Sequence, residues 1–198
     1  AYAGSQALDQ VGKGTIINGS LRFYQAKGTP LTQDEFAELC RRLQDTTILG
    51  RIELYLDLRQ VSDLSPLADM KRLEVLHLQN ANQLESLEVL RKTPNLRELS
   101  IAHLDRQCAL TPLKRLRKLK ELRLSHLQRD DFSDLGVLRK LQLLILEDVN
   151  VRDLSWMKPL KALQFLAVED CRQLAEIGPF ETHTKLHQVS LERCPQLS

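Results

Sequence analysis

The chain has 198 residues, of which 42% are hydrophobic and 27% are charged, proportions that are ordinary for a soluble folded protein. Its formal net charge of +2 implies no global attraction to a polyanion. No apolar run approaches the roughly 20 residues needed to cross a bilayer, so we expect no membrane insertion. The four cysteines are too few for a disulfide scaffold and favour a reducing compartment such as the cytoplasm.

Residues 1–45 predict an N-terminal cap made of a hairpin and a helix. Asn18-Gly19 separates two strand-like runs in TIINGSLRF, and this pair tolerates the positive φ angles of a tight turn. A helix is predicted after Thr32, because Glu35 three residues later completes a capping box. We expect these elements to cover the exposed apolar edge of the rest of the chain.

From residue 46 onward the leucines form a repeated pattern. In LKRLRKLKELRL, residues 113–124, successive leucines are three, three, three and two residues apart. Alternating steps of three and four are typical of an amphipathic α-helix, whereas a step of two is typical of a strand. The pattern recurs along residues 46–198, and its copies end at residues 56, 78, 101, 124, 146, 168 and 191. This period of 22–23 residues predicts an array of about seven repeats.

The pattern L-x-x-L-x-L resembles the leucine-rich repeat family. VSDLSPLADMKRLEVLHL, residues 61–78, is similar to internalin-type repeats, whereas VEDCRQL and LERCPQL resemble repeats with cysteine at the asparagine position. The resemblance implies an α/β solenoid with parallel strands on a concave face and short turns or 3₁₀ segments on the convex face. Stacked repeats of this kind share one continuous core.

The residues that flank the core leucines of each strand should point to the concave face. Leu143, Ile145 and Phe165, which we call the apolar patch, would lie on adjacent strands. Exposed apolar groups of this kind indicate a contact surface. We therefore expect a non-catalytic protein–protein interaction module or scaffold that binds a partner on its concave face, as part of a larger protein or complex.

A second concave feature is the acidic row, formed by Glu147, Glu169 and Glu192. These carboxylates should lie on consecutive strands, about 5 Å apart, and like charges so close favour a basic protein partner. The alternative is a solvated acidic edge. The full set of predicted partner-binding residues is Tyr55, His77, Arg123, Leu143, Ile145, Glu147, Phe165, Glu169 and Glu192.

Two further columns of residues lie just beyond the strands. The first is polar: Asn80, His103, His126, Asp148, Asp170 and Arg193. Its histidines and aspartates could hold a divalent metal, but parallel side chains converge poorly on a tetrahedral site, and turn-forming polar residues are expected at strand ends. The next column contains Cys171 and Cys194, which could form a bridge; buried thiols that donate weakly to turn carbonyls are the preferred interpretation.

The repeat 113–124 also carries a dense run of positive charge: Lys114, Arg115, Arg117, Lys118 and Lys120. We expect these side chains on the turns and convex surface, as a solvated charged face. The alternative function is association with nucleic acid through this basic patch, although no aromatic residue interleaves the charges. The chain has none of the common hydrolase or metalloprotease motifs, so we predict no catalytic residues, cofactor or metal.

Overall fold

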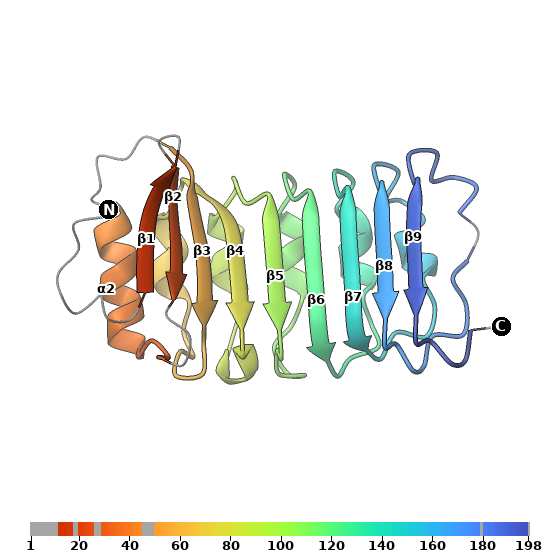
Figure 1. Ribbon diagram of the computed structural model, residues 1–198, viewed down its shortest axis with the longest axis horizontal. Helices are drawn as coiled ribbons and strands as arrows, with labels where there is room; N and C mark the ends of the chain where they lie inside the picture. The colour runs from red at the N-terminus through yellow and green to blue at the C-terminus, as the bar shows by residue number, and fades with distance from the viewer. Residues whose placement is uncertain (1–11, 18–19, 26–28, 45–49, 179, 198) are drawn as a thin grey trace.

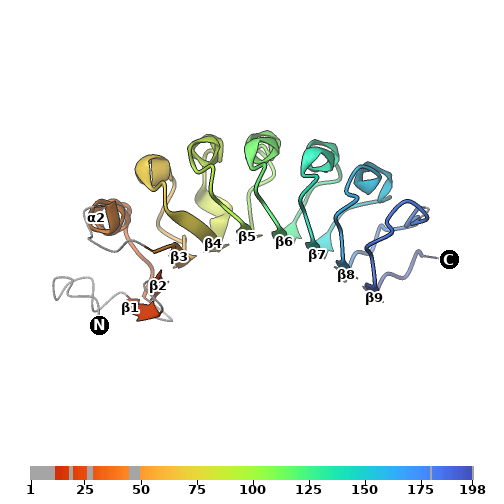
Figure 2. The same ribbon diagram turned by 90° about the horizontal axis from the view of Figure 1, so that it is seen from above.

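The computed structural model describes residues 12–17, 20–25, 29–44, 50–178 and 180–197. These residues form one nine-stranded sheet in which the strands lie side by side in chain order (Figure 1). The strands are β1 (Gly12–Ile17), β2 (Ser20–Gln25), β3 (Ile52–Asp57), β4 (Leu73–Gln79), β5 (Glu98–Ala102), β6 (Glu121–Leu127), β7 (Leu143–Val149), β8 (Phe165–Glu169) and β9 (Gln188–Glu192). In Figure 2 the sheet is the inner layer of an arc and the helical segments are the outer layer.

The predicted hairpin and helix are both present at the N-terminal end. β1 pairs antiparallel with β2, and β2 pairs parallel with β3, so the hairpin extends the sheet of the repeats. The turn predicted at Asn18-Gly19 lies outside the described residues. Helix α2 (Gln33–Gln44) begins with the predicted capping box, in which Glu35 Oε2 accepts from the N–H of Thr32 at 2.9 Å. The division of the chain at residue 45 stays a prediction.

The strict three-residue leucine spacing arises from 3₁₀ geometry. Leu113 donates its N–H to the carbonyl of Leu110 at 2.9 Å, and Leu116 donates to Leu113 in the same way. Such i→i+3 bonds give three residues per turn, so every third side chain lies on one face. The outer 3₁₀ segments are η1 (Ser65–Asp69), η3 (Glu88–Lys92), η4 (Thr111–Arg115), η5 (Ser133–Val137) and η6 (Ser155–Met157), and η2 (Ala81–Gln83) comes directly after β4.

The core runs without a break between the two layers. Leu122 of β6 lies in register with Leu99 on one side and Leu144 on the other, and all three are fully buried. The leucines of the 3₁₀ segments belong to the same buried cluster, and Figure 2 shows these segments along the convex side of the sheet. Each repeat therefore buries its apolar residues against both neighbours, as the resemblance implied.

Close packing of the outer layer generates a stability prediction at Gly136 of η5. A Cβ atom placed there would lie 2.7 Å from the backbone oxygen of Trp156 in the next repeat. We expect Gly136→Ala to lower the free energy of unfolding by about 1–3 kcal/mol, because backbone must move to accommodate the methyl group. Urea unfolding followed by circular dichroism would measure this.

The matched control is Val137→Ala, at the exposed neighbouring residue, which should change stability by less than about 0.5 kcal/mol. Equal stability of Gly136→Ala and the wild type would show that the two repeats are less tightly packed than the structure indicates.

Candidate binding surface

The predicted partner-binding residues lie in adjacent rows on the concave face. In the central row Tyr55 pairs with His77, and further along Arg123 pairs with Ile145. A second row, nearer the strand starts, brings Leu143 beside Phe165. A third row, nearer the strand ends, contains the acidic row in the order Glu147, Glu169 and Glu192.

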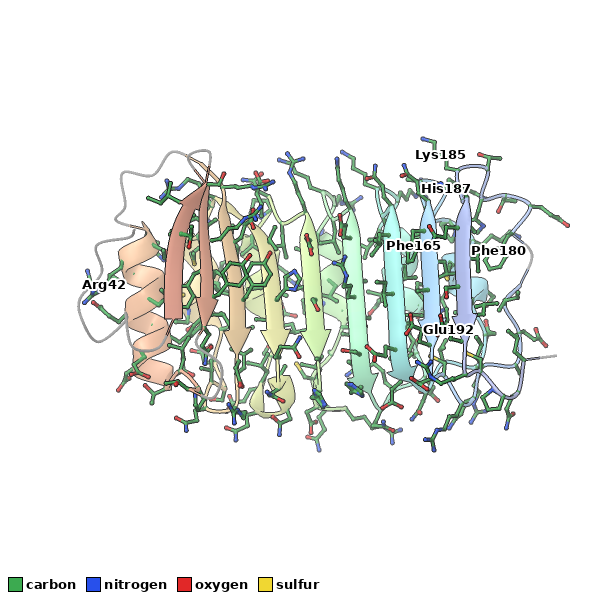
Figure 3. All side chains as sticks on the ribbon, viewed as in Figure 1. Arg42, Phe165, Phe180, Lys185, His187 and Glu192 are labelled. Atoms are coloured by element: carbon green, nitrogen blue, oxygen red, sulfur yellow. The ribbon has the colours of Figure 1, made fainter. Side chains whose placement is uncertain are left out.

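The apolar patch is a continuous, half-buried surface over β7 and β8. Leu143 and Phe165 are direct partners in the register, and Ile145 is paired with the buried Ala167. Figure 3 shows Phe165 on β8, with Glu192 towards the end of β9. Because the three patch residues keep partial exposure in the structure, a partner could cover them at little conformational cost.

Arg123 borders the apolar patch and is held by carboxylates. Its guanidinium contacts Glu98 Oε1 at 2.8 Å and Glu121 Oε2 at 3.1 Å. The same Glu98 oxygen lies 2.8 Å from Nε2 of His77. These two contacts fix the position of Arg123, and the carboxylates of Glu98 and Glu121 already balance its charge.

An aromatic stack continues this central row towards the N-terminal end. The Tyr24 and Tyr55 rings lie 4.3 Å apart, and the Tyr55 and His77 rings lie 4.5 Å apart. Burial raises the pKa of Tyr55, and its hydrogen bond with Tyr24 raises it further. Burial also lowers the pKa of His77 below its usual value of 6.5, and Glu98 offsets only part of that effect. Sequence reasoning missed Tyr24, because it assigned the hairpin to a cap rather than to the sheet.

Two members of the acidic row are partly compensated within the chain, which corrects the expectation that all three are like charges open to a basic partner. The Arg193 guanidinium lies 3.2 Å from Glu192 Oε2 and 3.7 Å from Glu169 Oε2. It also binds Asp170 at 2.6 Å, and this hydrogen bond holds the pKa of Asp170 below its usual range. Within the described part of the chain, Glu147 is the member of the row with no ion pair.

Some residues expected on the concave face are buried. Glu53 is only 2% exposed, and its carboxylate lies 2.7 Å from Nε of both Arg22 and Arg51. The charges are close, but Nε of Arg22 is not aligned for a hydrogen bond. The other buried positions are Val75, Ser100, Ala102 and Ala167. The accessible part of the face is therefore narrower than the strand pattern alone indicates.

The polar column lies at the strand ends, where turn-forming polar residues were expected. His126 and Asp148 are still within β6 and β7, and the other four residues follow their strands directly. Every one of its six residues, Asn80, His103, His126, Asp148, Asp170 and Arg193, has φ between 47° and 59°, the left-handed region. The His103 and His126 rings stack 4.5 Å apart, and Nδ1 of His126 contacts Asp148 at 2.9 Å. These rings lie against each other rather than pointing at a shared point, an arrangement poorly suited to holding a metal.

Both cysteines of this column donate weakly to backbone carbonyls, as the preferred interpretation predicted, but only Cys171 is buried and Cys194 is half-buried. Cys171 Sγ lies 3.4 Å from the carbonyl of Glu169, and Cys194 Sγ lies 3.4 Å from the carbonyl of Glu192. Both are free thiols in the structure. Burial raises the pKa of Cys171 to about 11, so this thiol is protonated and a poor nucleophile at neutral pH.

Comparison with known proteins gives structural matches only. Neither a protein-family model nor a curated protein matches the sequence. Internalin C2 of Listeria monocytogenes superposes with a TM-score of 0.60 and 21% identity, over 87% of this chain and 80% of that one. The chain has the leucine-rich repeat fold. Internalin F of the same species gives a TM-score of 0.57 at 21% identity, covering 87% of this chain and 47% of its own.

The leucine-rich repeat domain of the type III effector XopL matches with a TM-score of 0.50 and 19% identity, over 81% of this chain and 57% of that one. These matches confirm the predicted leucine-rich repeat fold. Identities this low show the architecture alone.

The surroundings of His77 predict the pH at which its imidazole titrates. Because burial lowers its pKa in the folded protein, the imidazole should titrate below pH 6.5 in an NMR titration of its ring protons. The unfolded chain then binds the proton more readily, so His77 contributes stability above about pH 6.5 that is lost as the pH falls. Glu98→Gln should lower the pKa of His77 further, whereas a midpoint above 6.5 in the wild type would show that Glu98 outweighs burial.

The hydrogen bonds between Arg193 and Asp170 predict the pH at which Asp170 titrates. They hold the pKa of Asp170 below the usual 3.8, so Arg193→Gln should raise the Asp170 midpoint in a carboxyl ¹³C NMR titration. The wild type should keep this contribution to stability above about pH 4 and lose it as the pH falls through the lowered pKa. Arg152→Gln, at an exposed arginine shortly after the end of β7, is the control and should leave Asp170 unchanged.

Proposed function

We propose that the chain is a non-catalytic interaction module that binds a protein partner on its concave face, centred on β7 and β8. The observation that carries the proposal is the apolar patch, in which Leu143, Ile145 and Phe165 lie together and partly exposed. Protein contacts are usually centred on a few apolar or aromatic anchors surrounded by polar groups. Solenoids present extended concave surfaces of this kind to their partners.

The surroundings of the patch favour a particular partner chemistry. Glu147 comes two residues after Ile145 on the same face of β7 and has no ion pair among the described residues, so it can accept a basic group without displacing another. Glu169 and Glu192 already share Arg193 and contribute less. The partner we propose presents an apolar side chain together with a neighbouring lysine or arginine.

The patch also argues for binding rather than catalysis. The concave face is an open sheet, and the residues beside the patch are fixed in ion pairs, such as that of Arg123 with Glu98. A nucleophile held beside a base is the usual arrangement for covalent catalysis, and the sequence offers no motif for one.

A test begins with selection of ligands for the wild-type chain from a displayed library of random peptides, and affinity measurements come next. Leu143→Asp/Phe165→Asp should weaken the selected ligands by at least about 30-fold, because it removes two anchors. Glu147→Lys should weaken ligands that contain a basic residue by about tenfold and leave neutral ligands unchanged.

The matched control is Val137→Asp/Ala109→Asp, which adds the same charge at exposed positions outside the strands. All variants must first show the circular dichroism spectrum and melting behaviour of the wild type. Equal loss in the control and the patch variant, or retained binding in the patch variant, would place the contact surface elsewhere.

A further inference from the structure

A second surface lies at the edge of the sheet where the parallel strands begin. Turns that lead into β6, β7, β8 and β9 bring eight exposed cations to this edge, and we call them the cationic edge: Arg115, Arg117, Lys118, Arg139, Lys140, Lys158, Lys161 and Lys185. Residues 115–120, 138–142 and 158–164 contain no aspartate or glutamate. Figure 3 shows Lys185 at this edge, beside His187. The cationic edge therefore extends the predicted basic patch across four consecutive repeats.

In the described part of the chain, the charges of the cationic edge are not paired with carboxylates. Among the described residues, Lys118 alone of the eight has a side-chain partner, and that partner is the neutral Asn95 at 2.7 Å. Many arginines elsewhere on the molecule bind carboxylates, as Arg59 does with Asp57 at 2.7 Å, although the exposed arginines that follow the strands, such as Arg152, have no ion pair among the described residues.

An ordinary solvated surface mixes the two signs of charge evenly. At this edge the eight cations outnumber the acidic residues, which include Glu181 in the turn before β9 and Asp134, whose Oδ1 lies 3.9 Å from Nζ of Lys114.

Backbone hydrogen bonds hold the turns of this edge at one level. The carbonyl of Lys120 accepts the N–H groups of both Gln142 and Leu143, at 2.7 and 3.0 Å, and the carbonyl of Gln142 accepts from Gln164 and Phe165 in the same way. In Figure 1 the turns above β5–β9 lie nearly along a line, and Figure 2 looks down on them as a crescent. The cationic edge is thus a level surface that several basic side chains share.

An apolar side chain lies within these basic surroundings. Val137 is the last residue of η5 and is 47% exposed, one of the few large hydrophobic residues that are exposed in the described structure. Arg139 and Lys140 come shortly after it in the chain, and Arg115 is the last residue of the preceding segment, η4. An apolar side chain beside cations can enter the region between lipid headgroups and acyl chains. The solvated phosphate backbone of a nucleic acid has no apolar region that could contact such a side chain.

We propose that the cationic edge binds the surface of a bilayer that contains anionic lipids. Each basic side chain close to such a surface contributes about a fivefold factor in affinity, and a level edge lets several act together. No helix in the described structure is long and apolar enough to cross a membrane, and the proposed contact is peripheral. The apolar patch lies on the concave face and adjoins this edge at Leu143 and Phe165, but this inference rests on different side chains from the proposed function.

Nucleic acid is the competing polyanion, and the structure favours it less. Single strands are usually bound by aromatic side chains that stack on the bases, and the turn segments 115–120, 138–142 and 158–164 contain no aromatic residue. A duplex would have to bend along the crescent seen in Figure 2, and bending duplex DNA on that scale costs free energy.

Vesicle sedimentation tests the proposal directly. The wild-type chain should bind vesicles in which about a third of the lipid is phosphatidylserine and should not bind phosphatidylcholine vesicles, with affinity that falls as the salt concentration rises. Arg117→Glu/Arg139→Glu/Lys161→Glu should reduce binding by at least about 100-fold. Val137→Ser should reduce it by a few-fold, in proportion to the apolar area lost.

The matched control is Arg106→Glu/Arg152→Glu/Arg172→Glu, which changes the net charge equally at exposed arginines beyond the opposite ends of the strands. It should retain most of the wild-type binding. Absence of binding to the phosphatidylserine vesicles, or equal loss in both triple variants, would overturn the proposal. Tighter binding to a duplex RNA or DNA, lost with the same three edge substitutions, would overturn it in favour of nucleic acid.

Discussion

The whole structure depends on repeats that bury their leucines only against each other. Leu122 is covered on both sides by Leu99 and Leu144, and the 3₁₀ segments close the same core from outside through their i→i+3 bonds. A single repeat has no such neighbours and could not hide its apolar edge. The register is strict as a consequence, because a slip by one residue would turn every core leucine outward.

The same register decides where charges meet. Equivalent side chains of neighbouring repeats lie about 5 Å apart, so like charges at one position repel unless another residue intervenes. On the concave face the chain supplies that residue: Arg123 between two glutamates, and Arg193 beside the acidic row. Among the described residues, no acidic side chain forms an ion pair with the eight cations of the cationic edge. The same repeat builds both surfaces, and they differ in whether a side chain of opposite charge is close enough to form an ion pair.

The core and strands were predictable because the period of 22–23 residues assigns each leucine an inward position. The binding surface was predictable only in outline. Sequence reasoning placed Leu143, Ile145 and Phe165 together, since strand alternation fixes their side. It did not pair the acidic row with Arg193, because it placed this arginine in the separate polar column at the strand ends. The burial of Glu53 was not predictable from the repeats, because Arg22 comes from a strand outside the repeat pattern.

The cationic edge and the acidic row lie towards opposite ends of the strands, and this changes what the net charge of +2 implies. The net charge alone predicts only weak attraction to a polyanion, but the electrostatic field near a surface depends on where the charges lie. The strand starts carry the cationic edge, and the strand ends carry Glu147, Asp148 and Asp170. An anionic bilayer would attract the first and repel the second, so one orientation is favoured. In that orientation the acidic row is held away from the lipid, where a basic partner segment can reach it without competition from the headgroups.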